Sequence, residues 1–294
     1  MARDGMREPA RVRYLRCVDA PLEGEVDPFY AFFVLDGRIM SVHRRFNLDL
    51  PGCSHTREKY RSSIVLTTYA ASGTGIRPDG ERVLFSGEDP RVVSDGRRAF
   101  ILCRTFDASG QSPAEYRLAI LPEGVEREIV PPPPLKGGKN WQPFLRDGRL
   151  FAVWSFAPLT VVEITHLGQM HAIHQRATEL WLPAAHDRYT MLRGGSNAMV
   201  AGDTVVGLGH LTRCRDDHRP FCWVLDPSMQ MTLSFSSTFF GLRAKGFNIV
   251  DPTSLFMFGD RLYLGLCCSE REWFYGQRFL NMLVELPCSD VGAL

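Results

Sequence analysis

Two short segments of the chain carry charged and amide side chains: carboxylates with an arginine in one, and a lysine with an amide in the other. Residues 88–91 read EDPR, and residues 139–141 read KNW. A carboxylic acid whose pKa is raised by burial or by a second carboxylate can protonate the leaving oxygen of a glycosidic bond. Because Glu88 and Asp89 are adjacent, their side chains would point to opposite sides of an extended strand. We therefore expect only one of these two carboxylates to face a shared pocket.

Other polar residues stand where apolar runs begin or end, and they extend the same chemistry. Arginine offers an oxyanion a planar fork of donors and lysine offers a point charge, so both suit phosphate. Asp251 could supply a second carboxylate, or its Asp-Pro step could simply begin a strand, as Asp27-Pro28 does. Trp141 could be a platform for a sugar ring or a core residue. The remaining candidates are Arg44, Arg91, Arg104, Arg193, His210 and Glu270.

A repeated strand-turn-strand pattern positions these candidates. Its turns are Asp-Gly or Gly-Asp pairs that begin at residues 36, 95, 147, 202 and 259, so successive units are 52–59 residues apart. Such pairs favour tight hairpins because glycine and aspartate tolerate positive φ. Further apolar runs between the hairpins supply more strands, and helical periodicity is scarce. The predicted hairpins lie near residues 27–45, 88–104, 141–155, 194–210 and 250–269.

Units of about 50 residues with four short strands each are typical of propeller blades. The sequence therefore predicts an all-β protein, a single five-bladed β-propeller domain over residues 1–294. A pair of β-sandwiches is the alternative, but it does not predict this period. We expect residues 1–22, an amino-terminal extension, and the segments 124–140 and 210–221 to lie outside the blades. The first strands of all blades surround one axis, so the candidates would converge in a single funnel.

Composition and charge exclude several classes of protein. The chain has 34 basic and 33 acidic residues, so its net charge does not favour nucleic acid. No apolar run approaches the roughly 18 residues of a membrane span, and the amino terminus lacks the apolar core of a secretion signal. We therefore expect a cytoplasmic protein whose eight cysteines, which form no CxxC pair, are reduced. Neither these cysteines nor His166, His171 and His174 predict a metal site, and dinucleotide, P-loop and zincin motifs are absent.

Several short motifs resemble one known enzyme family. Residues 87–91 (GEDPR), followed by Arg104, resemble glycoside hydrolase family 130, the mannoside phosphorylases and mannosidases, and its mannosyltransferase relatives. Lys139-Asn140 is similar to a step in the same family, and residues 207–210 (GLGH) resemble a strand that ends in a pocket histidine. Residues 141–144 and the stretch from Arg193 to Ser196 depart from the family pattern, which indicates a divergent branch.

This resemblance implies a five-bladed propeller in which Asp89 is the single general acid. Phosphate would take the place of a second protein carboxylate, as the nucleophile at the anomeric carbon. The residues expected to hold phosphate are Arg104, Lys139, Arg193 and His210. The residues expected to contact the sugar are Arg44, Glu88, Asn140, Trp141, Asp251 and Glu270.

The function expected on this basis is that of an inverting glycoside phosphorylase, or a hydrolase, acting on β-mannosides or related oligosaccharides. Inorganic phosphate would be a co-substrate, and no cofactor or metal is expected. Two alternatives stay open: a glycosyltransferase that uses a sugar-nucleotide donor, and a non-catalytic propeller that binds a glycan or a protein. We expect no nucleic-acid partner and no membrane span, and a homo-oligomer is compatible with the sequence.

Overall fold

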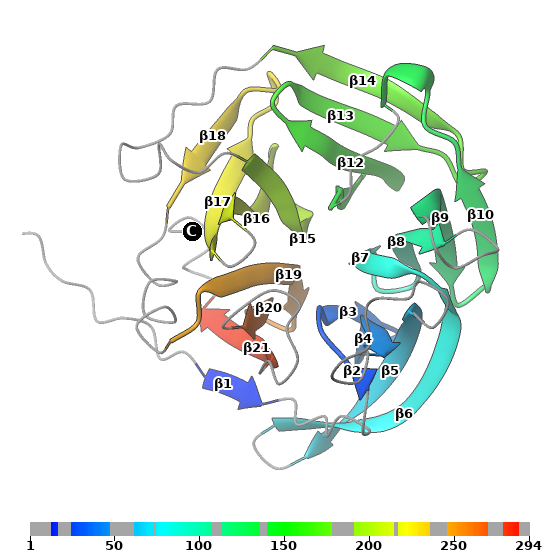
Figure 1. Ribbon diagram of the computed structural model, residues 1–294, viewed down its shortest axis with the longest axis vertical. Coiled ribbons are helices and arrows are strands. Elements are labelled where there is room, and N and C mark those ends of the chain that lie inside the picture. Colours follow the sequence, from blue (N-terminus) through cyan, green and yellow to red (C-terminus); the bar gives the residue numbers. More distant parts are fainter. Residues whose placement is uncertain are drawn as a thin grey trace, which may run out of the picture.

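The computed structural model describes residues 13–16, 25–47, 62–72, 75–106, 113–135, 140–177, 191–214, 217–235, 246–269 and 279–287. These residues are mostly β-strands, which form a ring around a central axis (Figure 1). Strand pairing divides them into five antiparallel blades, two of which are joined into one sheet by a single parallel pair, His218 with Ile249. The all-β propeller expected from the sequence repeat is confirmed.

Each blade is a meander that begins at the axis and ends at the rim. Blade one contains β3 (Ala31–Leu35), β4 (Arg38–Asn47), β5 (Ser62–Ser72) and β6 (Gly75–Ser86), with β2 (Glu25–Val26) also paired to β4. Blade two contains β7 (Glu88–Ser94), β8 (Ala99–Phe106), β9 (Pro113–Leu121) and β10 (Val125–Ile129). Blade three contains β11 (Gln142–Arg146), β12 (Arg149–Phe156), β13 (Leu159–Ile164) and β14 (Met170–Arg176).

The last two blades complete the ring. Blade four contains β15 (Met191–Ala201), β16 (Thr204–Cys214), β17 (Asp217–Leu225) and β18 (Met231–Ser234). Blade five contains β19 (Ile249–Phe258), β20 (Arg261–Ser269), β21 (Phe279–Pro287) and, as its outer strand, β1 (Arg13–Arg16). A strand from the beginning of the chain therefore closes the blade built by its end.

Three segments expected outside the blades contribute strands to them. Within residues 1–22, β1 pairs with β21 along all four of its residues. Within 124–140, β10 pairs with β9, and within 210–221 the ends of β16 and β17 form a hairpin. The expectation is therefore wrong for these strands, because their polar sequences hide the alternation that marks a strand.

Two of the hairpin turns adopt the conformation that their Asp-Gly pairs predict. Asp36 and Gly37 have φ values of 49° and 71°, and Asp147 and Gly148 have 52° and 71°. Positive φ at both central residues characterises the type I′ turn, whose twist matches that of the flanking strands. The five inner hairpins accordingly lie where the repeat predicts them.

The hydrophobic core consists of five clusters, each shared by two neighbouring blades. Phe33 of blade one packs with Ile101 of blade two, and Leu208 of blade four packs in a cluster with Leu264 of blade five. The other three clusters join blades two and three, three and four, and five and one. Burial between blades, rather than within one, therefore holds the ring together.

Buried polar side chains add hydrogen bonds across three of these blade borders. Gln142 of blade three donates to Ser196 O and Leu208 O, and its Oε1 accepts from Trp223 Nε1. Asn197 of blade four exchanges two hydrogen bonds with the backbone of Leu255. Thr253 of blade five donates to Tyr30 O of blade one. These bonds fix how the inner strands lie beside one another.

Two expectations about the environment of the chain concern the described residues only. Those residues contain no helix long and apolar enough to cross a membrane. Among the cysteines in them, Cys103, Cys222, Cys267 and Cys268 are buried free thiols. They behave as small apolar residues in the core.

Candidate active site

The beginnings of the inner strands bring several predicted residues to one end of the ring. Arg44 Nη1 lies 3.6 Å from Asp89 Oδ1, and Arg91 Nη2 donates to Asn140 Oδ1 at 3.1 Å. Burial lowers the pKa of Arg91, whereas the nearby carboxylates of Asp89 and Asp251 raise it. Arg91 therefore links candidates from blades two, three and five, and Arg44 adds blade one.

Asp89 has an unusual backbone conformation that decides where its side chain points. Its φ is 50°, in the left-handed region that aspartate and asparagine adopt more readily than most residues. The pairing of β7 with β8 shifts register between Glu88 and Arg91 at this point. As a result, the Arg44 guanidinium lies 3.4 Å from Glu88 Oε2 as well as 3.6 Å from Asp89 Oδ1. Both carboxylates contact Arg44, but only Asp89 lines a hollow beside Arg91 and Arg104, as expected of a single carboxylate that faces a shared pocket.

Glu88 is held between two arginines. Besides its contact with Arg44, its Oε1 lies 3.9 Å from Arg104 Nη1. Arg44 is only 2% exposed, and its Nε donates to Ser62 Oγ at 2.9 Å. Both oxygens of Glu88 are thus engaged with cations, which suits this carboxylate to positioning arginines better than to proton transfer.

A water-sized hollow of about 10 Å³ opens beside Asp89. The carboxylate of Asp89 and the cationic side chains of Arg91 and Arg104 line it together with Asn140. Leu102, Cys103, Tyr116 and Trp141 complete its lining, so an atom placed there would lie beside both charged and apolar residues. The hollow also brings Arg104, predicted to hold phosphate, to the same place as the predicted acid.

Trp141 lies in this wall as a packed residue. It is 4% exposed, and its ring centroid is 4.0 Å from that of Tyr116 and 3.9 Å from that of Trp154. Arg104 in turn lies over the Tyr116 ring, 5.5 Å from its centroid. Trp141 is therefore a core residue, because little of its indole is exposed for a sugar ring to cover.

A second group of polar residues joins blades four and five. His218 Nδ1 lies 2.9 and 3.1 Å from the two carboxylate oxygens of Asp251, and His210 Nδ1 lies 3.6 Å from Asp251 Oδ1. The two imidazoles stack with centroids 4.8 Å apart. Burial lowers the pKa of His210 to about 3. Burial would raise the pKa of Asp251, but the two histidines outweigh it and hold this pKa below its usual value.

The remaining predicted residues are placed as follows. Arg193 of β15 pairs with His210 of β16, so these two phosphate candidates are neighbours. Lys139 and Glu270 lie outside the described residues. Sequence reasoning missed His218, because its segment was expected to lie outside the blades. The available signal was a histidine just before an apolar run (HRPFCWVL), and the structure shows this histidine to be buried.

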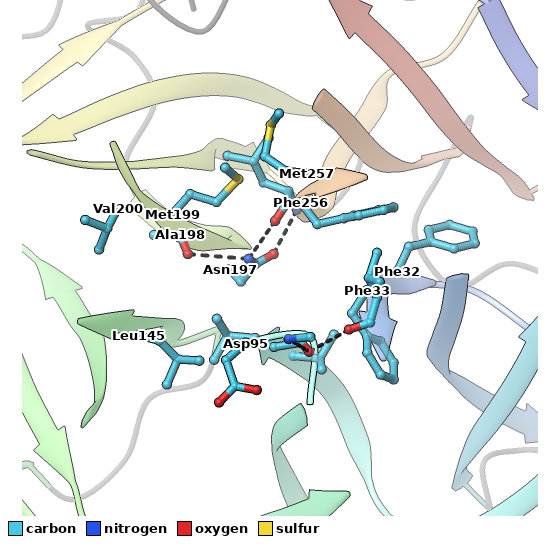
Figure 2. Close-up of a pocket in the computed structure, with 16 residues that line it drawn as sticks. Phe32, Phe33, Asp95, Leu145, Asn197, Ala198, Met199, Val200, Phe256 and Met257 are labelled. Carbon is cyan, nitrogen blue, oxygen red and sulfur yellow. Dashed lines mark hydrogen bonds between the residues drawn. The ribbon is translucent and has the colours of Figure 1, made fainter. Parts of the chain in front are cut away.

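A larger cavity of about 390 Å³ lies at the opposite, carboxyl-terminal ends of the inner strands (Figure 2). Its lining includes Phe33, Leu145, Val200 and Met257, and it contains none of the residues predicted to do chemistry. Asn197, which points toward it, already has its amide bonded to the backbone of Leu255. The predicted reactive side chains therefore gather away from this cavity.

No protein-family model and no curated protein matches this sequence. Among solved structures, the chain is similar to the β-1,2-mannobiose phosphorylase from Listeria innocua, with a TM-score of 0.66 at 11% identity over 96% of this chain and 98% of that one. These proteins share a fold. A mannose phosphorylase from Leishmania mexicana, determined with phosphate ion, has a TM-score of 0.56 at 13% identity over 96% of this chain and 90% of that one.

A third similar structure has a different activity. It is a GDP-Man-dependent mannosyltransferase from Leishmania mexicana, with a TM-score of 0.55 at 10% identity over 95% of this chain and 91% of that one. The same propeller thus carries phosphorolysis in some proteins and transfer from a sugar nucleotide in another. The fold implied by the resemblance in residues 87–91 is confirmed, while the choice of reaction depends on the site.

Proposed function

We propose that this chain is a glycosyl-transferring enzyme that cleaves β-mannosides or related oligosaccharides by inverting phosphorolysis. The observation that carries the proposal is the placement of Asp89, which faces Arg44 and lines a hollow with Arg91 and Arg104 at one end of the propeller axis. Its fold is shared with two phosphorylases of mannose compounds. An acid beside several fixed cations matches what phosphorolysis needs.

In this reaction Asp89 donates a proton to the glycosidic oxygen as the bond from that oxygen to the anomeric carbon breaks. A phosphate oxygen forms the new bond on the opposite face, and the phosphate hydroxyl proton restores the acid. The products are a sugar 1-phosphate and the released hydroxyl compound. Arginines near the acid would hold the phosphate, and the phosphate candidates are Arg104, Lys139, Arg193 and His210.

Transfer from a sugar nucleotide is the second candidate function. The similar mannosyltransferase is the observation that favours it. The same cations would then hold a diphosphate, and Asp89 would act on the acceptor hydroxyl instead of a leaving oxygen. Both reactions make the carboxyl group of Asp89 essential, so variants alone cannot separate them.

The substrates separate them. Purified protein would be incubated with β-mannoside and β-glucoside disaccharides, with and without inorganic phosphate, and with GDP-mannose plus acceptor sugars, while proton NMR follows the anomeric signals. A sugar 1-phosphate that forms only with phosphate supports the proposal, and its anomeric signal reports inversion. Free sugar in both tubes indicates hydrolysis, and loss of GDP-mannose indicates transfer. No product in any tube contradicts the enzyme proposal.

A matched pair of variants then tests Asp89 itself. Asp89→Asn removes the acid while asparagine still accepts a φ of 50°. Turnover should fall by about 10²–10⁴-fold, the usual contribution of a positioned general acid. Asp36→Asn makes the same exchange at a φ of 49° in an exposed hairpin turn, and should leave turnover unchanged. Near wild-type turnover in Asp89→Asn would remove this residue from the mechanism.

A further inference from the structure

Three buried donor groups converge between blades four and five. They are His210 on β16, His218 on β17 and Asp251 on β19, and one donor atom from each lies within 4.8 Å of the others. The parallel pair formed by His218 and Ile249 sets β17 beside β19, which brings His218 opposite Asp251. His210, His218 and Asp251 are 4%, 5% and 7% exposed, respectively. The blade border thus builds a compact donor set from strands 41 residues apart along the chain.

The donor set includes an atom without a partner. His210 Nδ1 is buried and has no hydrogen-bond partner in the described part of the chain. Such an atom is costly to bury unless something binds it.

We propose that His210, His218 and Asp251 bind one divalent transition-metal ion, for which Zn²⁺ is the best match. Ligands bound at about 2.0–2.1 Å in a tetrahedral site lie roughly 3.3–3.4 Å from one another. The separations of Asp251 Oδ1 from His218 Nδ1 and His210 Nδ1, 2.9 and 3.6 Å, bracket that spacing. Two imidazoles with one carboxylate suit Zn²⁺, whereas Ca²⁺ and Mg²⁺ prefer oxygen ligands throughout.

When the ion binds, the proton between His218 and Asp251 can move to the other nitrogen of the His218 ring. In the structure, His218 Nδ1 lies within hydrogen-bond distance of both Asp251 oxygens. Binding through Nδ1 requires the ring proton to occupy Nε2, which is the other neutral tautomer. The ion then lies between the imidazole and the carboxylate while the proton stays on the ring, so the cluster gains the two positive charges of the ion, of which the Asp251 carboxylate offsets one.

Two arginines near the cluster limit the affinity without filling the site. Arg91 and Arg193 both act on His210 as positive charges. Arg91, however, directs its donors to Pro90 O and Asn140 Oδ1. Three protein ligands leave a coordination position for water or an anion, and neighbouring arginines would favour an anion there. The inference gives His210 and Asp251 a role as metal ligands in place of the phosphate and sugar contacts expected of them, and it does not depend on the proposed function.

Metal binding can be measured without any turnover. Full-length protein carrying no histidine tag would be treated with EDTA, dialysed, and titrated with Zn²⁺ by calorimetry and with Co²⁺ by visible absorption. We expect one ion per chain and ligand-field bands of a low-coordinate Co²⁺ site. His218→Gln and Asp251→Asn should each weaken Zn²⁺ binding by at least about tenfold, since each removes one of three ligands.

The exposed histidine of β14 supplies the control for adventitious binding. His171→Ala removes a surface imidazole and should leave stoichiometry and affinity unchanged. The proposal is overturned if wild-type protein binds neither ion, or if binding survives in His218→Gln and disappears in His171→Ala. If the cluster variants fail to fold, NMR of the wild-type protein provides the test instead. Addition of Zn²⁺ must then shift the imidazole signals of two buried histidines. Activity with β-mannosides is scored separately, so failure of either proposal leaves the other testable.

Discussion

Acidification should destabilise this protein through His43, by an amount that follows from its surroundings. His43 is 0% exposed, and its ring stacks on Tyr30 with centroids 4.1 Å apart. Neither ring nitrogen has a hydrogen-bond partner among the described residues. Burial, helped by the charge of Arg45, lowers the pKa of His43 to about 3. The unfolded chain therefore takes up the proton first as the pH falls, which favours unfolding.

The size of this effect depends on how far the pH lies below the pKa of His43 in the unfolded chain. The stability that rests on a neutral His43 is complete above a pH of about 6.5 and is lost progressively down to about 3. At a pH of about 5 the loss of stability is about 2 kcal/mol. This pH lies about 1.5 units below the pKa of histidine in the unfolded chain, and each unit is worth about 1.36 kcal/mol. His43→Phe keeps a ring against Tyr30 and removes the titrating group without breaking a hydrogen bond in the described structure.

The measurement is urea unfolding followed by tryptophan fluorescence at a pH of about 7.5 and of about 5. His43→Phe should lose about 2 kcal/mol less stability between these conditions than wild type does. Other titrating groups cancel in this difference, since both proteins carry them. His166→Phe, at an exposed position, controls for the exchange itself. Identical pH dependence in wild type and His43→Phe, or an equal change in His166→Phe, would refute the reasoning.

Two further variants test the packing of the blades. In Gly207→Ala the new Cβ would collide with the indole of Trp223, which is 0% exposed, so stability should fall by about 1–3 kcal/mol and the thermal midpoint with it. Gln142→Leu leaves Trp223 Nε1 and the carbonyls of Ser196 and Leu208 without their partner, and should cost about 3 kcal/mol or more in a denaturant titration. Gln142→Glu keeps an acceptor for Trp223 but places a buried carboxylate oxygen against the carbonyls of Ser196 and Leu208, so it should lose at least as much, and a smaller loss than in Gln142→Leu would contradict this account.

The hairpins were predictable because their turns carry local chemistry. An Asp-Gly pair such as Asp36-Gly37 needs no distant partner to favour its turn, and the structure gives it the expected positive φ. The closure of the ring was not predictable in this way. Strand β1 (Arg13–Arg16) is four residues long and pairs with β21 more than 260 residues away, so nothing local marks it as a strand. The hairpin of β16 and β17 was missed because its polar residues are buried at the site rather than exposed.

The convergence of the site was predictable from the phase of the repeat, but its pairwise contacts were not. Residues at the beginnings of inner strands had to meet near the axis, and Asp89, Arg91 and Asn140 do. Which group faces which depends on backbone angles that sequence alternation does not report. The left-handed turn at Asp89 brings both neighbouring carboxylates to Arg44, and the pairing of β17 with β19 brings His218 to Asp251.

The left-handed conformation at Asp89 is not by itself a mark of catalysis. Phe29 and Asn140, which precede the inner strands of blades one and three, have φ values of 63° and 68°. Phe29 has no reactive group, so this conformation belongs to the way the propeller begins a blade. The chemical argument therefore rests on the carboxyl group of Asp89 and on the arginines around it. This is why Asp89→Asn, which keeps the conformation, measures that group alone, whereas Asp89→Ala would add backbone strain of roughly 1–3 kcal/mol and confuse stability with turnover.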